Sequence, residues 1–284
     1  MIHPHLTRAI NRFTRAAIGL KKNREKDAIA AAHLSAVRGF FQEQAHMVLF
    51  RFELAMRDQF PETQAAPVSF RQMGAKHPYS TEALKKWGEL WDGIEYETTP
   101  LLQQAVTAIE ADALQKGADQ LRAQLGFDAK RTFSLANPRA VAFFRKTGGS
   151  VDYIRDIQET TKESLKTVIT TGLDEGWSYS QTAREIRKLY DGPITVKRAQ
   201  LIATHEAAQA YEYGNFAFGK SIEDDGIIMR KRWVTSHDDR VSDGCQENED
   251  AGAIPLDEDF PSGDQTPPRF PGCRCYCAYE QEKP

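Results

Sequence analysis

The chain has 284 residues, enough for one large domain or two smaller ones with a buried core. Its hydrophobic fraction of 40% and charged fraction of 27% are ordinary for a globular protein and argue against a disordered chain. The sequence lacks the run of roughly 18 apolar residues that a transmembrane helix needs, and residues 1–20 lack the apolar core of a secretory signal. We therefore expect an intracellular protein without membrane contact, made in a reducing compartment.

The net charge of -3 is too small to indicate a partner, but the charges are unevenly distributed. A basic N-terminal segment is typical either of a solvated helix face or of a contact with nucleic acid or an acidic protein. The basic residues are Arg8, Arg12, Arg15, Lys21, Lys22, Arg24 and Lys26, and the acidic C-terminal ones are Asp238, Asp239, Asp243, Glu247, Glu249, Asp250, Asp257, Glu258 and Asp259.

The first half of the chain has helical periodicity. Apolar residues recur at steps of three and four from Leu34 to Ala55, which predicts one face of an amphipathic helix that ends near Pro61. Residues 64–80 contain prolines and a glycine and are predicted to form a connection. The sequence Thr98-Thr99-Pro100 predicts the start of a further helix, with the proline in its first turn.

A break over residues 126–138 predicts the domain boundary. We expect an N-terminal helical region over residues 1–128 and a second domain over residues 129–284. Within the boundary segment, Asn137-Pro138 is typical of a turn or of the entry to a helix.

The second region begins with more helices. After the break at residues 148–150, apolar spacing predicts a long helix that ends around Gly172. Ser178 and Gln181 fit a capping box, which opens a short helix that meets Gly192-Pro193. Another helix is predicted from about Thr195 to Phe218.

The pattern changes near Gly226. Residues 227–234 have strand propensity, and from Ser236 onward glycine, proline and aspartate dominate and helical periodicity disappears. Cys273, Cys275 and Cys277 alternate, so a regular strand would place all three on one face. The predicted fold is mainly α, with long amphipathic helices and a small C-terminal β- and loop-rich, cysteine-containing element, α+β overall.

Four segments with characteristic sequences follow one another along the chain. They are residues 133–138 (FSLANP) with the run 171–186 (TGLDEGWSYSQTAREI), 198–206 (RAQLIATHE), 231–242 (KRWVTSHDDRVS) followed by Cys245, and 267–275 (PPRFPGCRC). In this order they resemble the phage Mu F-like minor head, or head morphogenesis, family over about the C-terminal half. The second segment resembles the family pattern RAxxIARTE and the fourth resembles PPxHPxCRC.

The chain departs from the family pattern at two positions. His205 stands where the family usually has arginine, and Phe270 stands where it usually has histidine. The second departure removes a potential metal ligand.

The resemblance implies a structural virion protein rather than an enzyme: a minor head component of few copies that acts in capsid assembly and influences DNA packaging or ejection. The implied partners are the portal protein, the major capsid or scaffolding protein, and phage DNA. The implied location is the virion head, after assembly in the host cytoplasm. Residues that mark the family are expected to serve folding of the C-terminal domain: Thr204, Glu206, Trp233, Asp238, Arg240, Cys245, Cys273, Arg274 and Cys275.

The cysteines are the sharpest chemical feature. Cys245, Cys273 and Cys275 offer three soft ligands for a structural zinc ion, with Cys277 or His237 as a fourth. On one extended strand Cys273 and Cys277 would lie roughly 13 Å apart, too far for one ion. Free structural thiols, or a disulfide from Cys245 to Cys273 or Cys275, remain alternatives, although a reducing cytosol disfavours the disulfide.

Two other functions stay open as alternatives. A metal-dependent hydrolase or toxin-like effector would use His205, Glu206, His237 or Asp238, but residues 205–209 lack the second histidine of an H-E-x-x-H motif. The structural interpretations of these residues are a buried polar contact of Glu206, with Arg240 or another donor, and a turn capped by Asp238. A DNA-binding packaging factor would use the basic N-terminal helix.

Overall fold

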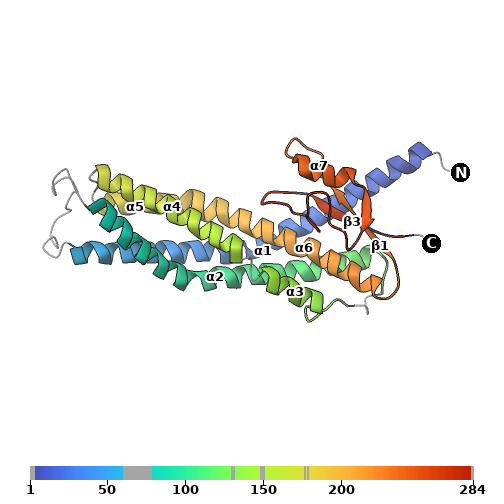
Figure 1. Ribbon diagram of the computed structural model, residues 1–284, viewed down its shortest axis with the longest axis horizontal. Coiled ribbons are helices and arrows are strands. Elements are labelled where there is room, and N and C mark those ends of the chain that lie inside the picture. Colours follow the sequence, from blue (N-terminus) through green and yellow to red (C-terminus); the bar gives the residue numbers. More distant parts are fainter. Residues whose placement is uncertain are drawn as a thin grey trace. The chain divides into compact units, whose positions relative to one another are not determined.

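The computed structural model describes residues 4–59, 79–128, 132–147, 151–175, 177 and 179–282. They are mainly helical, with a small sheet near the C-terminus (Figure 1), which confirms the predicted fold class. None of the helices in these ranges is long and apolar enough to span a membrane. The elements are α1 (Pro4–Gln59), α2 (Tyr79–Gln124), α3 (Pro138–Thr147), α4 (Val151–Glu175), α5 (Tyr179–Leu189), the π-helical segment η3 (Tyr190–Arg198), α6 (Ala199–Glu223), β1 (Met229–Val234), α7 (Asp243–Asp250), β2 (Ala253–Pro255) and β3 (Tyr276–Gln281).

The chain divides into two compact units, each assembled from separate stretches of sequence. Unit 1 contains Met1–Leu34, Val106–Gly148 and Leu201–Pro284, and unit 2 contains Ser35–Ala105 and Gly149–Gln200. Both regions expected from the sequence contribute to each unit. This division does not test the domain boundary expected near residue 128, which stays a prediction.

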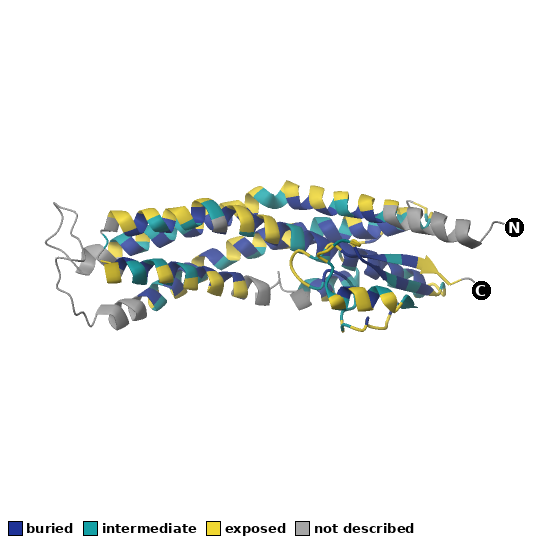
Figure 2. Ribbon diagram, turned by 90° about the horizontal axis from the view of Figure 1, so that it is seen from above, coloured by how far each residue is buried: buried dark blue, intermediate teal, exposed yellow. Residues whose placement is uncertain are grey.

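Unit 2 is a set of helices whose buried and exposed residues alternate along each helix (Figure 2). The predicted stripe of α1 is confirmed, because Val37, Phe41, Val48 and Phe52 are all buried. The helix ends at Gln59, close to the predicted end at Pro61.

A chain of polar side chains crosses the core of unit 2. The Gln44 amide donates to Gln158 Oε1 at 2.6 Å, and the Tyr190 hydroxyl donates to Gln44 Oε1 at 3.0 Å. The Gln158 amide in turn donates to Thr99 Oγ1 at 3.3 Å. Because buried polar groups need partners, this chain fixes how α1, α2, α4 and η3 pack within the unit.

The predicted helix start at Thr98-Thr99-Pro100 is wrong, because α2 runs through it and Pro100 lies inside the helix. A proline removes the hydrogen bond to the carbonyl four residues earlier. That carbonyl belongs to Tyr96, whose side chain is 83% exposed, and Pro100 is itself exposed. The interruption therefore lies where water can bind the carbonyl.

The predicted break at Gly192-Pro193 is also wrong. Helical structure continues from α5 through η3 into α6 without an intervening loop. The π-helical hydrogen-bond pattern spans an extra residue per turn, which accommodates the missing N–H of a proline. Buried Ile194 and Thr195 keep this segment packed in unit 2.

The signals around Asn137 are confirmed. The Asn137 side chain accepts a hydrogen bond from Arg139 N at 2.9 Å and thus caps α3. The predicted connection at residues 64–78, the break at 148–150 and the cap residue Ser178 lie outside the described residues.

Unit 1 is built around α6, which is buried on nearly all sides from Glu206 to Gly219. Its closest neighbour is α2, and each helix presents a glycine at the crossing. A Cβ atom on Gly214 would lie 2.1 Å from the Leu114 carbonyl oxygen, and one on Gly117 would lie 2.0 Å from the Tyr211 carbonyl oxygen. The two backbones approach so closely only because neither glycine carries a side chain.

The sheet of unit 1 is antiparallel, with strand order β2-β1-β3 (Figure 1). The predicted strand at residues 227–234 is confirmed as β1. Along it Met229, Lys231 and Trp233 are buried, and Trp233 packs edge-on against Phe260 with ring centroids 5.2 Å apart. The short helix α7 was not expected, since its few residues show no apolar periodicity.

We expect Gly214→Ala to lower the free energy of unfolding by about 1–3 kcal/mol, because the new methyl group meets backbone atoms that cannot move independently. Urea denaturation followed by circular dichroism measures the change. The matched control is Gly39→Ala in α1, where nothing lies within 4 Å of the new Cβ. It should leave stability unchanged or raise it by up to about 1 kcal/mol. Equal effects of the two substitutions would contradict the close crossing.

Candidate functional site

Three cysteine side chains gather at one point of unit 1. Their sulfur atoms, from Cys245, Cys273 and Cys275, all lie within 4.8 Å of one another. The Cys245 and Cys273 sulfurs are 3.9 Å apart. Cys245 and Cys275 are buried, and Cys273 is half-buried. This group could hold a metal ion, as the sequence predicted.

Local backbone structure places the cysteines. Cys245 lies in the first turn of α7, where its N–H donates to the N-cap side chain Ser242 at 3.3 Å. Cys273 closes a turn in which its N–H donates to the Phe270 carbonyl at 3.0 Å, with Gly272 in the left-handed region at φ +92°. The turn brings Cys273 and Cys275 back toward the start of α7.

Cys277 does not belong to this group, so its expected role as a fourth ligand is not supported. Strand β3 begins only at Tyr276, and the expected alternation of three cysteines on one face fails because the first two precede the strand. The Cys277 N–H donates to Glu212 Oε2 at 3.1 Å, away from the clustered sulfurs. Burial, together with the Glu212 charge, raises the pKa of the Cys277 thiol to about 12.

His237 is engaged by other groups. Its Nδ1 lies 3.2 Å from the Thr235 hydroxyl, and its Nε2 lies 3.4 Å from Glu249 Oε1. The side chain is 58% exposed. The structure does not bring His237 into the cysteine group as a ligand.

The four cysteines are free thiols, and the alternative of a disulfide does not hold in this structure. The 3.9 Å between the Cys245 and Cys273 sulfurs is well beyond the roughly 2.05 Å of a disulfide bond.

The surroundings of the group favour negative charge at Cys273. A hydrogen bond from Cys275 lowers the pKa of Cys273 to about 6. Arg269 lies beside Cys245 and is held by Asp264, whose Oδ2 accepts from Arg269 Nε at 2.8 Å. The fully buried indole N–H of Trp233 has no hydrogen-bond acceptor by geometry and lies near the Cys275 sulfur. The hydrogen bond with Cys273, together with burial, raises the pKa of Cys275, so without a metal ion the pair favours one thiolate, at Cys273.

The predicted turn at Asp238 is confirmed. Asp238 Oδ1 accepts a hydrogen bond from Arg240 N at 3.1 Å, which makes an Asx turn. Oδ2 of the same carboxylate pairs with Arg274 and, at 3.8 Å, with Arg240. Because Arg274 stands between two of the clustered cysteines, Asp238 ties the turn after β1 to the cysteine segment.

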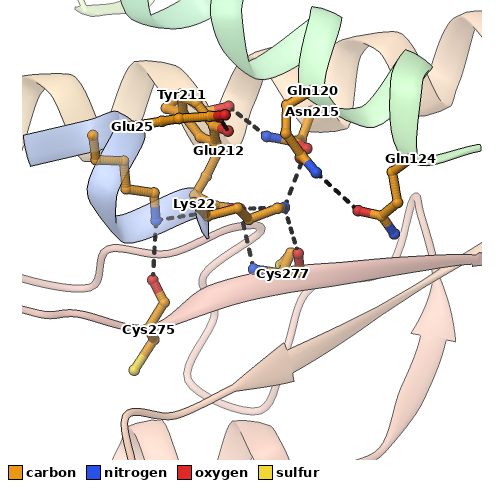
Figure 3. Close-up of polar contacts among 10 residues, drawn as sticks. Lys22, Glu25, Gln120, Gln124, Tyr211, Glu212, Asn215, Cys275 and Cys277 are labelled. Carbon is orange, nitrogen blue, oxygen red and sulfur yellow. Dashed lines mark hydrogen bonds and ion pairs between the residues drawn. The ribbon is translucent and has the colours of Figure 1, made fainter. Parts of the chain in front are cut away.

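A second polar centre in unit 1 is a buried carboxylate with two buried lysines (Figure 3). Glu212 of α6 lies 2.6 Å from Lys26 Nζ and 3.7 Å from Lys22 Nζ, and the Glu212 and Lys22 side chains are fully buried. Lys22 also donates to Asn215 Oδ1 at 3.1 Å and to the Cys277 carbonyl at 2.8 Å. We call Lys22, Lys26, Glu212 and Asn215 the buried clamp.

The clamp fixes the N-terminal part of α1 against β3. Lys26 Nζ lies 3.4 Å from the carbonyl oxygen of Cys275, just before the strand. A Cβ on Gly19 would lie 2.4 Å from the Tyr276 ring, so the glycine lets that ring lie directly on the helix. The helix and the strand are thus joined by charge, hydrogen bonds and close packing.

The clustered cysteines and Glu212 lie in a segment that a comparison with known proteins matches. Residues 163–278 match the family model described as Phage Mu protein F like protein. This segment is a Phage Mu protein F-like domain. The comparisons with curated proteins and with solved structures gave no match.

The Mu F-like domain contains Glu212 and the clustered cysteines, whereas Lys22 and Lys26 come from outside the matched residues. Burial by itself would raise the pKa of Glu212, but the two lysines and their hydrogen bonds lower it below its ordinary value. Burial lowers the pKa of Lys22. The carboxylate therefore stays ionised in the core.

The clamp was not predicted. Lys22 and Lys26 were assigned to a basic segment, whereas both side chains are buried and unavailable to DNA. One signal was present: the two lysines are four residues apart and continue the stripe of Ala30 and Val37 toward the N-terminus. A lysine on the buried stripe of a helix indicates that a buried acidic or carbonyl group binds it.

Two further family-marking residues, Thr204 and Glu206, belong to α6. Glu206 is fully buried and Thr204 is half-buried. Burial lowers the pKa of His205 to about 4, so its imidazole is neutral at neutral pH. Arg240, in contrast, is 71% exposed and pairs with Asp238, so the expected contact between Glu206 and Arg240 is not supported.

We expect Glu212→Gln to lower the free energy of unfolding by about 3–5 kcal/mol at pH 7, because two buried ammonium groups lose their counter-charge. The native carboxylate has a lowered pKa, so its contribution is present above the ordinary carboxyl pKa and is lost as pH falls through the lowered value. The stability difference should therefore shrink in acid. Urea denaturation across pH measures it.

The matched control is Glu163→Gln in α4, which removes an exposed partner of Lys166. It should change the free energy of unfolding by no more than about 0.5 kcal/mol. If Glu212→Gln were equally mild, the clamp would not stabilise the fold.

Proposed function

We propose that the protein is a minor head protein that acts in phage head morphogenesis at the portal vertex. The Phage Mu protein F-like domain over residues 163–278 carries the proposal. Its partners would be the portal protein and the major capsid or scaffolding protein. It would reside in the virion head after assembly in the host cytoplasm.

The roles of individual residues support assembly rather than turnover. Asp238, Arg240 and Arg274 contact one another and close a turn. Trp233 packs against Phe260 in the core of the domain. These family-marking residues build the domain, as expected for a structural protein whose function is to present surfaces to partners.

We further propose that the cysteine group binds a structural zinc ion. Thiolate sulfur is a preferred zinc ligand, and the sulfurs of Cys245, Cys273 and Cys275 are close enough to share one ion. Bound there, zinc would join α7 to the segment before β3. The loops between these elements have little regular secondary structure, so the ion would add cohesion to that given by the buried side chains of Leu256 and Phe260.

Influence on DNA packaging or ejection belongs to the same proposal. A direct DNA contact through the basic N-terminal segment would have to use residues other than Lys22 and Lys26, which the clamp buries. Lys21 and Arg24 are exposed. Their neutralisation, rather than that of Lys22, is the suitable test of salt-dependent DNA binding.

Co-expression with the portal protein of the same phage tests the assembly role. The two proteins should co-purify as a complex of defined stoichiometry, measured by native mass spectrometry, because a minor head protein docks on a particular vertex. An unrelated phage's portal protein is the control. If the chain bound none of the three partners from the same phage, namely the portal protein, the coat protein and procapsids, the assembly role would be wrong.

Zinc binding is tested on the full chain purified under reducing conditions. Elemental analysis should find one zinc per chain, and removal of the ion with a chelator should lower Tm by about 5 °C or more. Cys273→Ser should lose the ion, whereas the control Cys277→Ala should keep it, since Cys277 lies outside the group. A wild-type chain that retains no zinc, or an ion that survives in Cys273→Ser, would argue against the site.

A further inference from the structure

We infer that the metal site formed by Cys245, Cys273 and Cys275 keeps an open fourth position. This position accepts an imidazole nitrogen from outside the chain, supplied by a histidine of an assembly partner. The inference rests on the proposed zinc site and extends it from a structural tie to a point of attachment. The first observation that supports it is the number of ligands among the described residues.

The described residues supply three ligands. A zinc ion is tetrahedral in structural sites, and its open position, where one exists, binds an external group. Among the described residues, only the three cysteine sulfurs gather within 4.8 Å of one another, without a histidine, aspartate or glutamate among them. The coordination sphere is therefore incomplete in this part of the chain.

Nearby groups that could serve as a fourth ligand have other partners. His237 contacts Thr235 and Glu249 through its two ring nitrogens. Asp264 Oδ2 accepts from Arg269, and the Asp238 carboxylate is shared by its Asx turn and Arg274. Recruiting any of them would break contacts that shape the site.

Cys277 is held within β3, outside the group of three sulfurs. Its N–H binds Glu212 and its carbonyl binds Lys22, so the clamp fixes the backbone on both sides of this side chain. To reach the other sulfurs, the residue would have to leave its pairing with Trp233 in the sheet.

One side of the group is accessible to a partner. Cys245 is 1% exposed and Cys275 5%, whereas Cys273 is half-buried and its neighbours Phe270 and Arg274 are exposed. A ligand from outside would therefore approach on the side of Cys273. Phe270, whose carbonyl binds the Cys273 N–H, is an exposed aromatic residue of the kind that packs against an incoming side chain.

Charge favours imidazole over a further thiolate. Zinc with three thiolates carries one net negative charge, and a fourth thiolate would add another. The two arginines beside the group, Arg269 and Arg274, already neutralise Asp264 and Asp238. A neutral imidazole completes the tetrahedron without more buried negative charge.

Cobalt(II) substitution of the full-length protein, read by visible absorption, tests the inference. Thiolate-to-cobalt charge-transfer bands should report the three cysteines, and titration with free imidazole should shift the d–d bands saturably while those charge-transfer bands remain. Such a shift, with wild-type and His237→Ala proteins giving the same spectra before and after imidazole, supports the open position.

Two results would overturn it. Unchanged d–d bands at saturating imidazole would show a closed site, and an altered starting spectrum in His237→Ala would show that this histidine is the fourth ligand. Absence of thiolate charge transfer in the wild-type protein would instead reject the metal site itself. Co-purification with the portal protein is measured independently of cobalt, so failure of the assembly role is distinguishable from both.

Discussion

The Glu212 carboxylate is fully buried in α6, and its charge is balanced by Lys22 and Lys26 from the N-terminal helix. Removing one partner of a buried ion pair costs several kcal/mol, because the remaining charge has lost its water as well as its counter-charge. The N-terminal part of α1 is therefore part of the same folding unit as the sheet. The Mu F-like domain, as delimited by residues 163–278, contains the carboxylate but not the lysines, so its core is completed by a helix that lies far from it in the sequence.

The buried clamp also holds the backbone next to the cysteine group. Lys26 lies at hydrogen-bond distance from the carbonyl of Cys275, whose sulfur belongs to the group, and Lys22 binds the carbonyl of Cys277. The two polar centres thus share one stretch of backbone, with the clamp on one side and the sulfurs on the other. This arrangement explains why one cysteine of the C-x-C-x-C run has a different role from the other two. It also makes the position of the clustered sulfurs dependent on the N-terminal helix, since Lys26 of that helix holds the backbone at Cys275.

Much of the fold was predictable because its signals are local. The stripe from Leu34 to Ala55, the cap at Asn137, the strand around Trp233 and the turn at Asp238 each depend on residues within a few positions of one another. The wrong predictions have tertiary causes. Pro100 lies within a helix at an exposed carbonyl, and Pro193 lies in a π-helical segment that packing holds in place. Helix α7 escaped prediction because its cap at Ser242 and its buried Cys245, rather than an apolar stripe, define it.

By itself the sequence determined the helical body, the small C-terminal sheet, the resemblance to the Mu F-like family and the three soft ligands at Cys245, Cys273 and Cys275. Periodicity and composition are sufficient for these predictions, because they indicate which residues face the core and which side-chain chemistry is present. Only the tertiary structure decided which charges meet. It placed Lys22 against Asn215, 193 residues away in the sequence, and bound the Cys277 backbone to Glu212, apart from the other three cysteines. Periodicity can show that a lysine faces the core, but its partner depends on how distant segments pack, and that information is absent from any local pattern.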